Sequence, residues 1–283
     1  MNSCIVLDGR KVADESNSKL SLKASTLEKQ FGRKPCLAAI LVGDDPASAT
    51  YIAMKEKACE SVGVKTKTFK ESQDSTTKDI LDLIESLNQD KKIDGILLQH
   101  PVPKGIDELS CFNKIAIEKD VDGVTTKGFG NIVMGIDSFG SCTPLGIMRL
   151  LEAYNIDCTG KLALIIGRSQ ILGKPMAAML LNKNATTITA HSRTENLDEL
   201  LHQADIVVAA LGKPNFIDCR KLKKGSILID AGYHPKDKCG DVNMCGIEDI
   251  VSAYTPVPGG VGPMTINTLI YNTIEAMEKR INV

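Results

Sequence analysis

Short apolar runs that alternate with helix-length amphipathic stretches are the feature that most limits how this chain can fold. Buried strands are predicted at 36–42, 64–69, 94–99, 161–166, 186–190, 206–210 and 226–230. Helices are predicted at 11–31, 77–89, 145–152, from about 173, at 265–279, and after Asp45, with Asp45 as N-cap and Pro46 as first helical residue. Apolar strands alternating with helices are typical of parallel sheets covered by helices on both faces. The sequence therefore predicts an α/β protein.

The length and the glycine pattern predict two domains. The chain has 283 residues, and a domain averages roughly 150 residues. The segment 120–146 is rich in glycine and weakly periodic, and it is predicted to be loop and linker with the domain boundary near 140. We expect one α/β domain over 1–140 and a Rossmann-like domain over 141–264.

Composition excludes several functional classes. Thirty-four Lys and Arg against 35 Asp and Glu give a net charge of −1, so no nucleic-acid or anionic-membrane partner is predicted. No apolar run approaches ~18 residues, and the start of the chain lacks the features of a signal peptide. The nine cysteines form no CxxC pair, which favours free thiols and a cytoplasmic location. One candidate metal cluster fits no zinc spacing, so no metal is predicted: Cys219, His234, Cys239 and Cys245.

A dinucleotide-binding turn is predicted after the strand at 161–166. Gly167 would permit a tight turn at the strand end, and Gly173 would let the next helix pack closely, with its N-terminal N–H groups facing a diphosphate. Ser169 stands where the usual motif has its middle glycine, and the last glycine comes one residue late. A purely structural strand–turn–helix is therefore an open alternative.

The end of the next strand indicates which dinucleotide binds. An NAD site usually has a carboxylate there for the ribose hydroxyl, but this strand runs into His191-Ser192-Arg193-Thr194. Arg168, Ser192 and Arg193 could instead donate hydrogen bonds to a 2′-phosphate. The sequence thus predicts NADP, and the alternative is that both arginines are solvated surface cations.

Four further residues could take part in chemistry. Tyr51 and Lys55 lie four apart on one face of the predicted helix, and a partly desolvated lysine can act as a base or polarise water. Gln99 closes a strand at the sheet edge where ligands collect, and Asp122 lies in an acidic turn. The alternatives are a solvated lysine, an ordinary strand-end amide and a carboxylate that only stabilises the turn.

Several motifs together resemble the bifunctional methylenetetrahydrofolate dehydrogenase/methenyltetrahydrofolate cyclohydrolase family, from about Val6 to the C-terminus. The motifs are Val42–Tyr51 with Lys55, Asp94–Gln99 with the prolines that follow, Lys119–Gly123, Cys142–Gly146, Gly167–Pro175, His191–Thr194 and Thr255–Thr265. The last is close to a family signature, with stiff prolines and glycines that let the backbone approach a ligand.

The resemblance implies a role for each candidate. Lys55 is essential for hydrolysis and activates water, Tyr51 stacks on the folate, and Gln99 holds the lysine. Asp122 anchors the pterin through paired hydrogen bonds. The residues implied to bind or lie near NADP are Gly167, Arg168, Ser169, Ser192, Arg193, Thr143 and Tyr233. The residues implied to lie near the folate are Pro258, Gly259 and Gly262.

The resemblance also implies the architecture and the reactions. The family has two α/β domains with a cleft between them, a last helix (about 265–283) that returns to the N-terminal domain, and homodimeric assembly. The substrates are tetrahydrofolate derivatives. NADP-dependent oxidation of 5,10-methylenetetrahydrofolate gives 5,10-methenyltetrahydrofolate, which is hydrolysed to 10-formyltetrahydrofolate.

The chain departs from the family pattern near the expected pocket. Val124–Gly128 replaces a Phe-His-Pro-x-Asn stretch, while His100, Ile117 and Tyr233 replace Leu, Pro and Ile respectively. Two other hypotheses stay open on the sequence. One is an NADP dehydrogenase for another small substrate, of the hydroxy-acid or shikimate type, and the other is a non-catalytic dinucleotide-binding or scaffold protein.

Overall fold

The computed structural model describes residues 4–281 and divides the chain into two compact α/β units. The three-stranded unit comprises Glu15–Cys142 and the segment from Ile266 onward. The six-stranded unit comprises Thr143–Thr265 and the segment up to Asp14. Helices α1 (Gly9–Phe31) and α9 (Val261–Ile281) contribute residues to both units.

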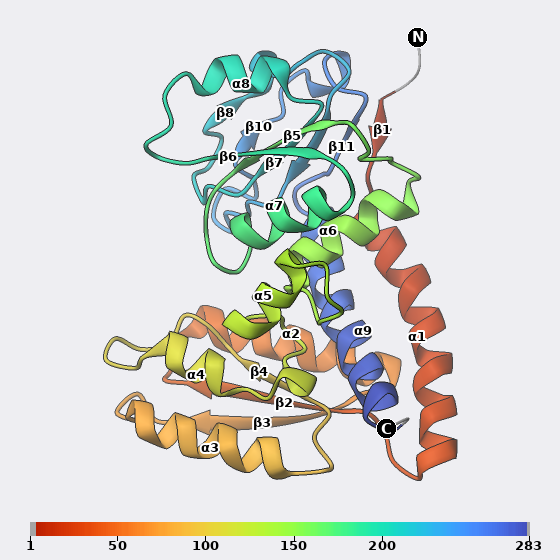
Figure 1. The fold of residues 1–283 in the computed structure, drawn as a ribbon, viewed down its shortest axis with the longest axis vertical. Coiled ribbons are helices and arrows are strands. Elements are labelled where there is room, and N and C mark those ends of the chain that lie inside the picture. Colours follow the sequence, from red (N-terminus) through yellow and green to blue (C-terminus); the bar gives the residue numbers. More distant parts are fainter. Residues whose placement is uncertain (1–3, 282–283) are drawn as a thin grey trace. The chain divides into compact units, whose positions relative to one another are not determined.

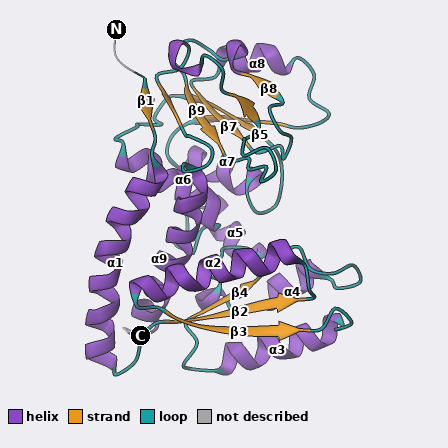
Figure 2. Ribbon diagram, turned by 180° about the vertical axis from the view of Figure 1, so that it is seen from behind, coloured by secondary structure: helices purple, strands orange, loops and turns teal. Residues whose placement is uncertain are grey.

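The three-stranded unit is built on a parallel sheet of order β3-β2-β4. Its elements in chain order are β2 (Cys36–Val42), α2 (Pro46–Val62), β3 (Lys65–Glu71), α3 (Thr77–Gln89), β4 (Gly95–Leu98), α4 (Glu108–Lys114), a 3-10 turn (Ile117–Lys119) and α5 (Thr126–Val133). Figures 1 and 2 show α2 and α3 on opposite faces of this sheet.

Every side chain of the central strand β2 is buried, because successive residues point to opposite faces and both faces are covered. Leu37 and its same-face neighbours pack with Ile52 of α2, with α1 and with α9. Ile40 and its same-face neighbours pack with Ile80 of α3 and Phe112 of α4. The continuous apolar run that was predicted as a buried strand therefore contributes side chains to two separate hydrophobic cores.

The six-stranded unit has a parallel sheet of order β1-β11-β9-β7-β5-β6. Its elements are β1 (Ile5–Val6), α6 (Cys142–Ala153), β5 (Leu162–Ile166), α7 (Gly173–Asn182), β6 (Thr186–Ala190), α8 (Leu197–Gln203), β7 (Ile206–Ala209), β8 (Ile217–Asp218), a 3-10 turn (Cys219–Lys221), β9 (Ile227–Asp230), β10 (Val242–Asn243), a 3-10 turn (Ile247–Asp249) and β11 (Ala253–Tyr254). Residues of α6 and α7 pack on one face, and α8 packs on the other. The chain order places β6 on one side of β5 and β7 on the other, which creates the topological switch point where α/β sheets bind ligands.

The segment predicted as loop and linker is partly helical, so that part of the prediction is wrong. Helix α5 forms because the Thr125 side chain accepts a hydrogen bond from Gly128 N at 2.9 Å and so caps its first turn. The Asp120 carboxylate also holds the amides of Val124 and Thr125, at 3.0 and 2.9 Å. The sequence did not predict this helix because it contains glycines at 128 and 130, and glycine disfavours helix interiors.

The predicted domain limits differ from the two units at the N-terminus. Strand β1 pairs in parallel with β11, with Ile5 opposite Ala253, and so joins the six-stranded sheet. The segment up to Asp14 therefore groups with the C-terminal unit rather than with 15–140. A strand of two residues gives too little periodicity to be predicted, and its partner lies far away in the chain.

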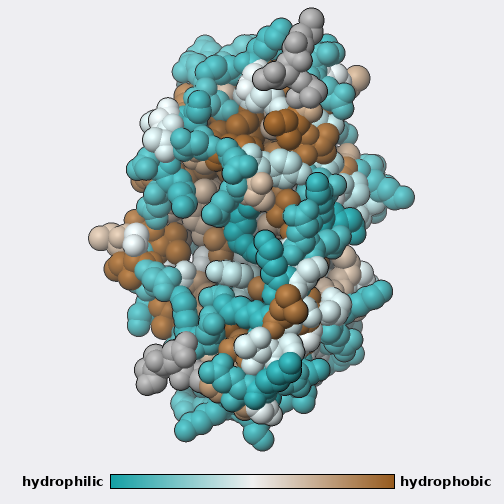
Figure 3. Space-filling view, turned by 90° about the vertical axis from the view of Figure 1, so that its right-hand side faces the viewer, coloured by the Kyte–Doolittle hydropathy of each residue, from teal (hydrophilic) through white to brown (hydrophobic). Residues whose placement is uncertain are grey.

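The surface drawn in Figure 3 is mostly hydrophilic, with hydrophobic atoms in separate patches. No helix within residues 4–281 combines the length and the apolar character needed to cross a bilayer. The nine cysteines all lie in the described part of the chain and are free thiols there. Six of them are buried: Cys36, Cys59, Cys111, Cys142, Cys158 and Cys219.

Candidate active site

Helix α2 presents Lys55 to the end of strand β4. The Asp45 side chain caps this helix by accepting from Ser48 N at 2.8 Å, and Pro46 is its first residue, as predicted. Two and a half turns later the Lys55 ammonium donates to Gln99 Oε1 at 3.0 Å. The lysine is half-buried. It is therefore neither freely solvated nor enclosed.

The Gln99 amide is held in a fixed orientation. Gln99 is 7% exposed, and its backbone N–H continues the ladder with Ile40 O at 2.9 Å. Its Nε2 donates to His100 O at 2.8 Å, which directs Oε1 at Lys55. An amide with both ends engaged restricts the lysine to a narrow set of positions. Tyr51, one turn before Lys55 on α2, is 43% exposed and offers its ring to solvent.

Two aspartates share the turn after the 3-10 helix, and they have different surroundings. Asp120 is 1% exposed and accepts from two backbone amides of the turn, while burial raises the pKa of its carboxyl group. Asp122 is half-buried, and its backbone carbonyl accepts from Cys142 N at 3.2 Å. Asp120 therefore stabilises the turn, which is the role that the sequence left open as an alternative for Asp122. The side chain of Asp122 is not needed for that purpose.

Gly123 and the start of α6 bring a residue to this site that the sequence did not assign. Gly123 has φ +68°, and a Cβ there would lie 2.3 Å from Ser141 N, so only glycine allows this close approach. The approach seats Cys142, whose thiol donates to Val121 O at 3.3 Å. Burial raises the pKa of the Cys142 thiol well above its usual value; the charge of Asp122 adds to the increase and that of Lys55 opposes it. Cys142 therefore lies within electrostatic reach of both predicted residues.

The predicted phosphate-binding turn forms at the end of β5. Gly167 has φ +140°, and a Cβ would lie 2.3 Å from Ala210 O, while a Cβ on Gly173 would lie 2.2 Å from Gly167 O. The Ser169 hydroxyl accepts from Leu172 N and Gly173 N at 3.2 Å each. Ser169 thus caps the start of α7 and keeps its own O–H for donation. Both glycines are required by close packing, as the motif predicted.

The neighbouring strand ends in a tight turn beside Gly167. Gly167 N donates to Ala190 O at 2.9 Å, which puts the ends of β5 and β6 side by side. His191 N donates to Thr194 Oγ1 at 2.8 Å, and Arg193 N donates to His191 Nδ1 at 3.2 Å. These bonds close the turn and leave three exposed donor side chains on adjacent loops, those of Arg168, Ser192 and Arg193.

The remaining predicted residues all lie in the six-stranded unit. Thr143 Oγ1 accepts from Thr265 Oγ1 at 3.1 Å, and Tyr233 is 47% exposed in the loop after β9. The 255–264 segment is only partly a loop, because α9 begins at Val261 and not at 265. Gly262 and the exposed Pro258 flank that start, and Gly259 O accepts from Arg10 N at 3.0 Å. Tyr51 and Asp122 belong to the three-stranded unit.

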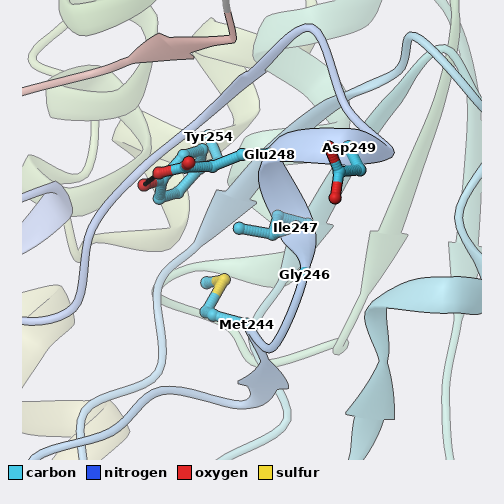
Figure 4. A pocket seen from close by; sticks show the side chains of 6 residues that line it. All are labelled: Met244, Gly246, Ile247, Glu248, Asp249 and Tyr254. Carbon is cyan, nitrogen blue, oxygen red and sulfur yellow. Dashed lines mark hydrogen bonds between the residues drawn. The ribbon is translucent and has the colours of Figure 1, made fainter.

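A shallow cavity of about 340 Å³ lies elsewhere in the six-stranded unit. Figure 4 shows its six lining residues, with Tyr254 beside Glu248, to which its hydroxyl donates at 3.1 Å. None of the predicted site residues lines it. Carboxylates of Glu248 and Asp249 would repel a phosphate, so this cavity does not suit a dinucleotide. Within residues 4–281, no three His, Cys, Asp or Glu side chains are grouped to hold a metal ion.

Comparisons with known proteins match both units. The model of the tetrahydrofolate dehydrogenase/cyclohydrolase catalytic domain matches residues 7–122, and that of the NAD(P)-binding domain matches residues 141–281. The bifunctional protein FolD of Cellvibrio japonicus is 53% identical over 279 residues, which is 99% of each chain.

Solved structures agree with these matches. The bifunctional enzyme FolD of Campylobacter jejuni has a TM-score of 0.96 at 41% identity, covering 98% of this chain and 100% of that one. The FolD of Trypanosoma brucei, solved with NADP and an inhibitor, has a TM-score of 0.94 at 30% identity and full coverage of both chains. Two family models and full-length relatives show that this chain belongs to the tetrahydrofolate dehydrogenase/cyclohydrolase family.

Proposed function

We propose that this chain catalyses two successive steps on tetrahydrofolate derivatives. It oxidises 5,10-methylenetetrahydrofolate with NADP and then hydrolyses 5,10-methenyltetrahydrofolate to 10-formyltetrahydrofolate. Family membership supports both steps, since relatives along the full length are named as bifunctional. The observation that carries the assignment in this chain is the 3.0 Å hydrogen bond from Lys55 to Gln99, in electrostatic reach of the site formed by Asp122 and Cys142.

The turn at the end of β5 and its neighbour suit NADP. Gly167 permits the tight turn at the end of β5 on which a dinucleotide-binding motif depends. The four residues after β6, His191 to Thr194, include no carboxylate, and Arg168, Ser192 and Arg193 are exposed donors for a 2′-phosphate. Ser169 adds a hydroxyl donor. When bound, NADP supplies a hydride acceptor, and the protein's part is to hold the donor and acceptor carbons together.

We assign Thr143 and Tyr233 to the surroundings of the cofactor. Pro258, Gly259 and Gly262 are assigned to the folate, together with Tyr51 as a stacking surface. The exposed rings of Tyr51 and Tyr233 favour contact with flat ligands, because aromatic side chains combine a large apolar face with a polar edge. Gly259 has φ +114° and carries no side chain, so the backbone there can approach a ligand closely.

Hydrolysis needs a base at the carbon that is attacked, and Lys55 is placed for that role. The base is the neutral form of the lysine, which has two N–H groups and a lone pair, so in that form Lys55 can donate to Gln99 Oε1 and still accept a proton from water. The water oxygen bonds to the methenyl carbon while its proton passes to Lys55 Nζ. The resulting adduct carries a hydroxyl group on that carbon. Cleavage of the bond between the carbon and N5, with the Lys55 proton returned to N5 and the hydroxyl proton released to solvent, then leaves the formyl group on N10. Gln99 holds the amine in place throughout.

Asp122 is proposed to anchor the pterin ring. A carboxylate can accept two parallel hydrogen bonds from a ring N–H and its neighbouring amino group. Asp120 already accepts from the amides of the turn. The Asp122 carboxylate interacts with the Cys142 thiol, and its other acceptor positions are the ones proposed for this ligand. We also propose, on the resemblance alone, that the chain is a cytoplasmic homodimer. Sedimentation velocity of the purified chain would contradict the homodimer by showing a monomer at micromolar concentration.

Replacement of Lys55 by Met tests the proposal. The variant keeps an unbranched side chain on α2 but has no N–H to donate and no lone pair on nitrogen. Loss of general-base catalysis is expected to lower the hydrolysis rate by about 10²–10⁴-fold, while oxidation of methylenetetrahydrofolate with NADP continues. Both are followed spectrophotometrically on one sample. Lys57→Met is the control, because Lys57 lies on the same helix and is exposed.

The two assays distinguish an error in the role of Lys55 from an error in the proposed function. Hydrolysis at the parent rate in Lys55→Met would refute the role of the lysine. Failure of the parent protein to turn over methylenetetrahydrofolate with NADP would refute the proposed function itself.

A further inference from the structure

A buried carboxylate in the six-stranded unit collects donors from two loops. Asp241 is fully buried. Its Oδ2 accepts from Leu211 N at 2.6 Å and Gly212 N at 2.9 Å, and its Oδ1 accepts from Lys213 N at 2.8 Å. His234 Nε2 makes a fourth bond to Oδ1 at 2.9 Å. One side chain thus fixes three successive amides after β7 and a ring from the loop after β9.

A second buried carboxylate supports the first. Asp230, the last residue of β9, accepts from Gly232 N at 2.9 Å and Asp241 N at 3.0 Å through Oδ1, and from Val242 N at 2.9 Å through Oδ2. A Cβ on Gly240 would lie 2.1 Å from Asp230 Oδ2. Position 240 must therefore be glycine, because a side chain there would clash with Asp230 just before Asp241.

The loop held by Asp241 lies at the dinucleotide turn. Strand β7 is the direct neighbour of β5, and Ala210 N donates to Ile166 O at 2.9 Å. Ala210 O is the atom 2.3 Å from a Cβ at Gly167. The segment 211–213 therefore leaves the sheet at the end of β7, on the side of β5 opposite to β6. The ends of these three strands form the topological switch point, where a ligand of this sheet would lie.

We propose that Asp241 is a positioning residue for the NADP-dependent step: it holds 211–213 in the conformation that receives the cofactor, with His234 as its second anchor. This inference rests on the proposed function. Asp241 acts through the loop, since its carboxylate is occupied by four protein donors. A carboxylate suits this task because both its oxygens accept, whereas an amide would turn an NH₂ group toward backbone N–H donors.

Asp241→Asn tests the proposal through the two activities of one chain. If the loop keeps its receptive conformation only a tenth of the time, the apparent KM for NADP rises about tenfold, while kcat at saturating NADP is largely kept. Hydrolysis of added methenyltetrahydrofolate needs no NADP and depends on Lys55 and Gln99 in the other unit, so it should change less than about twofold. His234→Ala, which removes one of the four donors, should raise the KM for NADP by a smaller factor.

Asp205→Asn is the matched control. Asp205 also accepts a backbone amide, Leu162 N at 2.9 Å, but at the amino end of the same sheet, before β7. It should leave the KM for NADP unchanged. A purely structural role for Asp241 predicts less active protein, which lowers kcat of both activities together and leaves KM unaltered; that pattern, or an unchanged KM with both rates intact, would overturn the proposal. A parent protein without dehydrogenase activity would instead refute the proposed function.

Discussion

Asp230 should give the six-stranded unit a stability that falls as pH rises in the mildly acidic range. Burial raises the pKa of its carboxyl group to about 6, and the neighbouring charge of Asp241 adds to the effect against three backbone N–H donors. An aspartate in an unfolded chain has a pKa of about 3.9. The folded state therefore holds this proton more tightly by about two pKa units, which corresponds to roughly 3 kcal/mol. That stabilisation is fully present below about pH 4 and is lost as pH rises through about 6.

Asp230→Asn removes the titrating proton while keeping a side chain of similar size. Urea unfolding followed by circular dichroism, from pH 4 to pH 7.5, gives the free energy of unfolding of parent and variant. The parent-minus-variant difference should fall by about 3 kcal/mol over this range. The absolute difference at one pH also includes the altered hydrogen bonds of the amide, so the test is the change with pH.

A second aspartate in the same sheet supplies a control of opposite sign. The ion pair with Lys223 and the hydrogen bond from Leu162 N lower the pKa of Asp205. The stabilisation from Asp205 is therefore present at neutral pH and lost as pH falls through its lowered pKa. Measured to pH values below that lowered pKa, parent minus Asp205→Asn should thus increase as pH rises, and it should be nearly constant in the range where the Asp230 difference falls. Parallel pH profiles for parent and Asp230→Asn, with the Asp205 control behaving as expected, would refute the reasoning.

Three further changes test other parts of the molecule. Arg168→Ala combined with Arg193→Ala should raise the KM for NADP by about tenfold or more and that for NAD far less, because charge-assisted bonds to the 2′-phosphate are lost; equal losses would refute NADP selection. Lys119→Met should lower the free energy of unfolding by about 3 kcal/mol in urea titrations, because the buried ammonium satisfies three backbone carbonyls at the end of α3; a change under about 1 kcal/mol would contradict this. Gly123→Ala should lower the melting temperature measured by calorimetry, since φ is +68° and the Cβ has no room, whereas Gly130→Ala, with open space around it, should not.

Local signals made much of the fold predictable. The strand at 36–42 and the helix at 77–89 have the predicted bounds. The strand is an uninterrupted apolar run, and the helix begins with a capping box, in which Thr76 and Asp79 bond each other's backbone N–H groups. Helix α5 was not predicted because its two glycines lower the local helix propensity more than its N-cap raises it. Helix α9 begins four residues before the predicted start because Pro263 is tolerated in a first turn.

The site was predictable in part, through motifs rather than through geometry. The family is confirmed by the comparisons, and the structure contains the expected hydrogen bond between Lys55 and Gln99. The roles of these residues stay predictions. Spacing alone did not reveal that Asp120, not Asp122, satisfies the turn, because the two differ only in burial. Nor did it reveal Asp241, whose four partners come from loops separated along the chain and meet only when β7 and β9 lie side by side.

The division of the chain also bears on its synthesis. The core beneath β2 includes Leu269, Ile270, Ile274 and Met277 of α9, a helix that is made after every strand of both sheets. Strand β1 is made before the other strands of its sheet, and it finds its partner only after β11 has been made. A nascent chain emerging at about 5–20 residues per second therefore holds exposed apolar surface in both units until β11 and α9 have been made. A truncation that removes the last helix should consequently yield a chain that depends on chaperones or is degraded, even though every strand of the smaller sheet is intact.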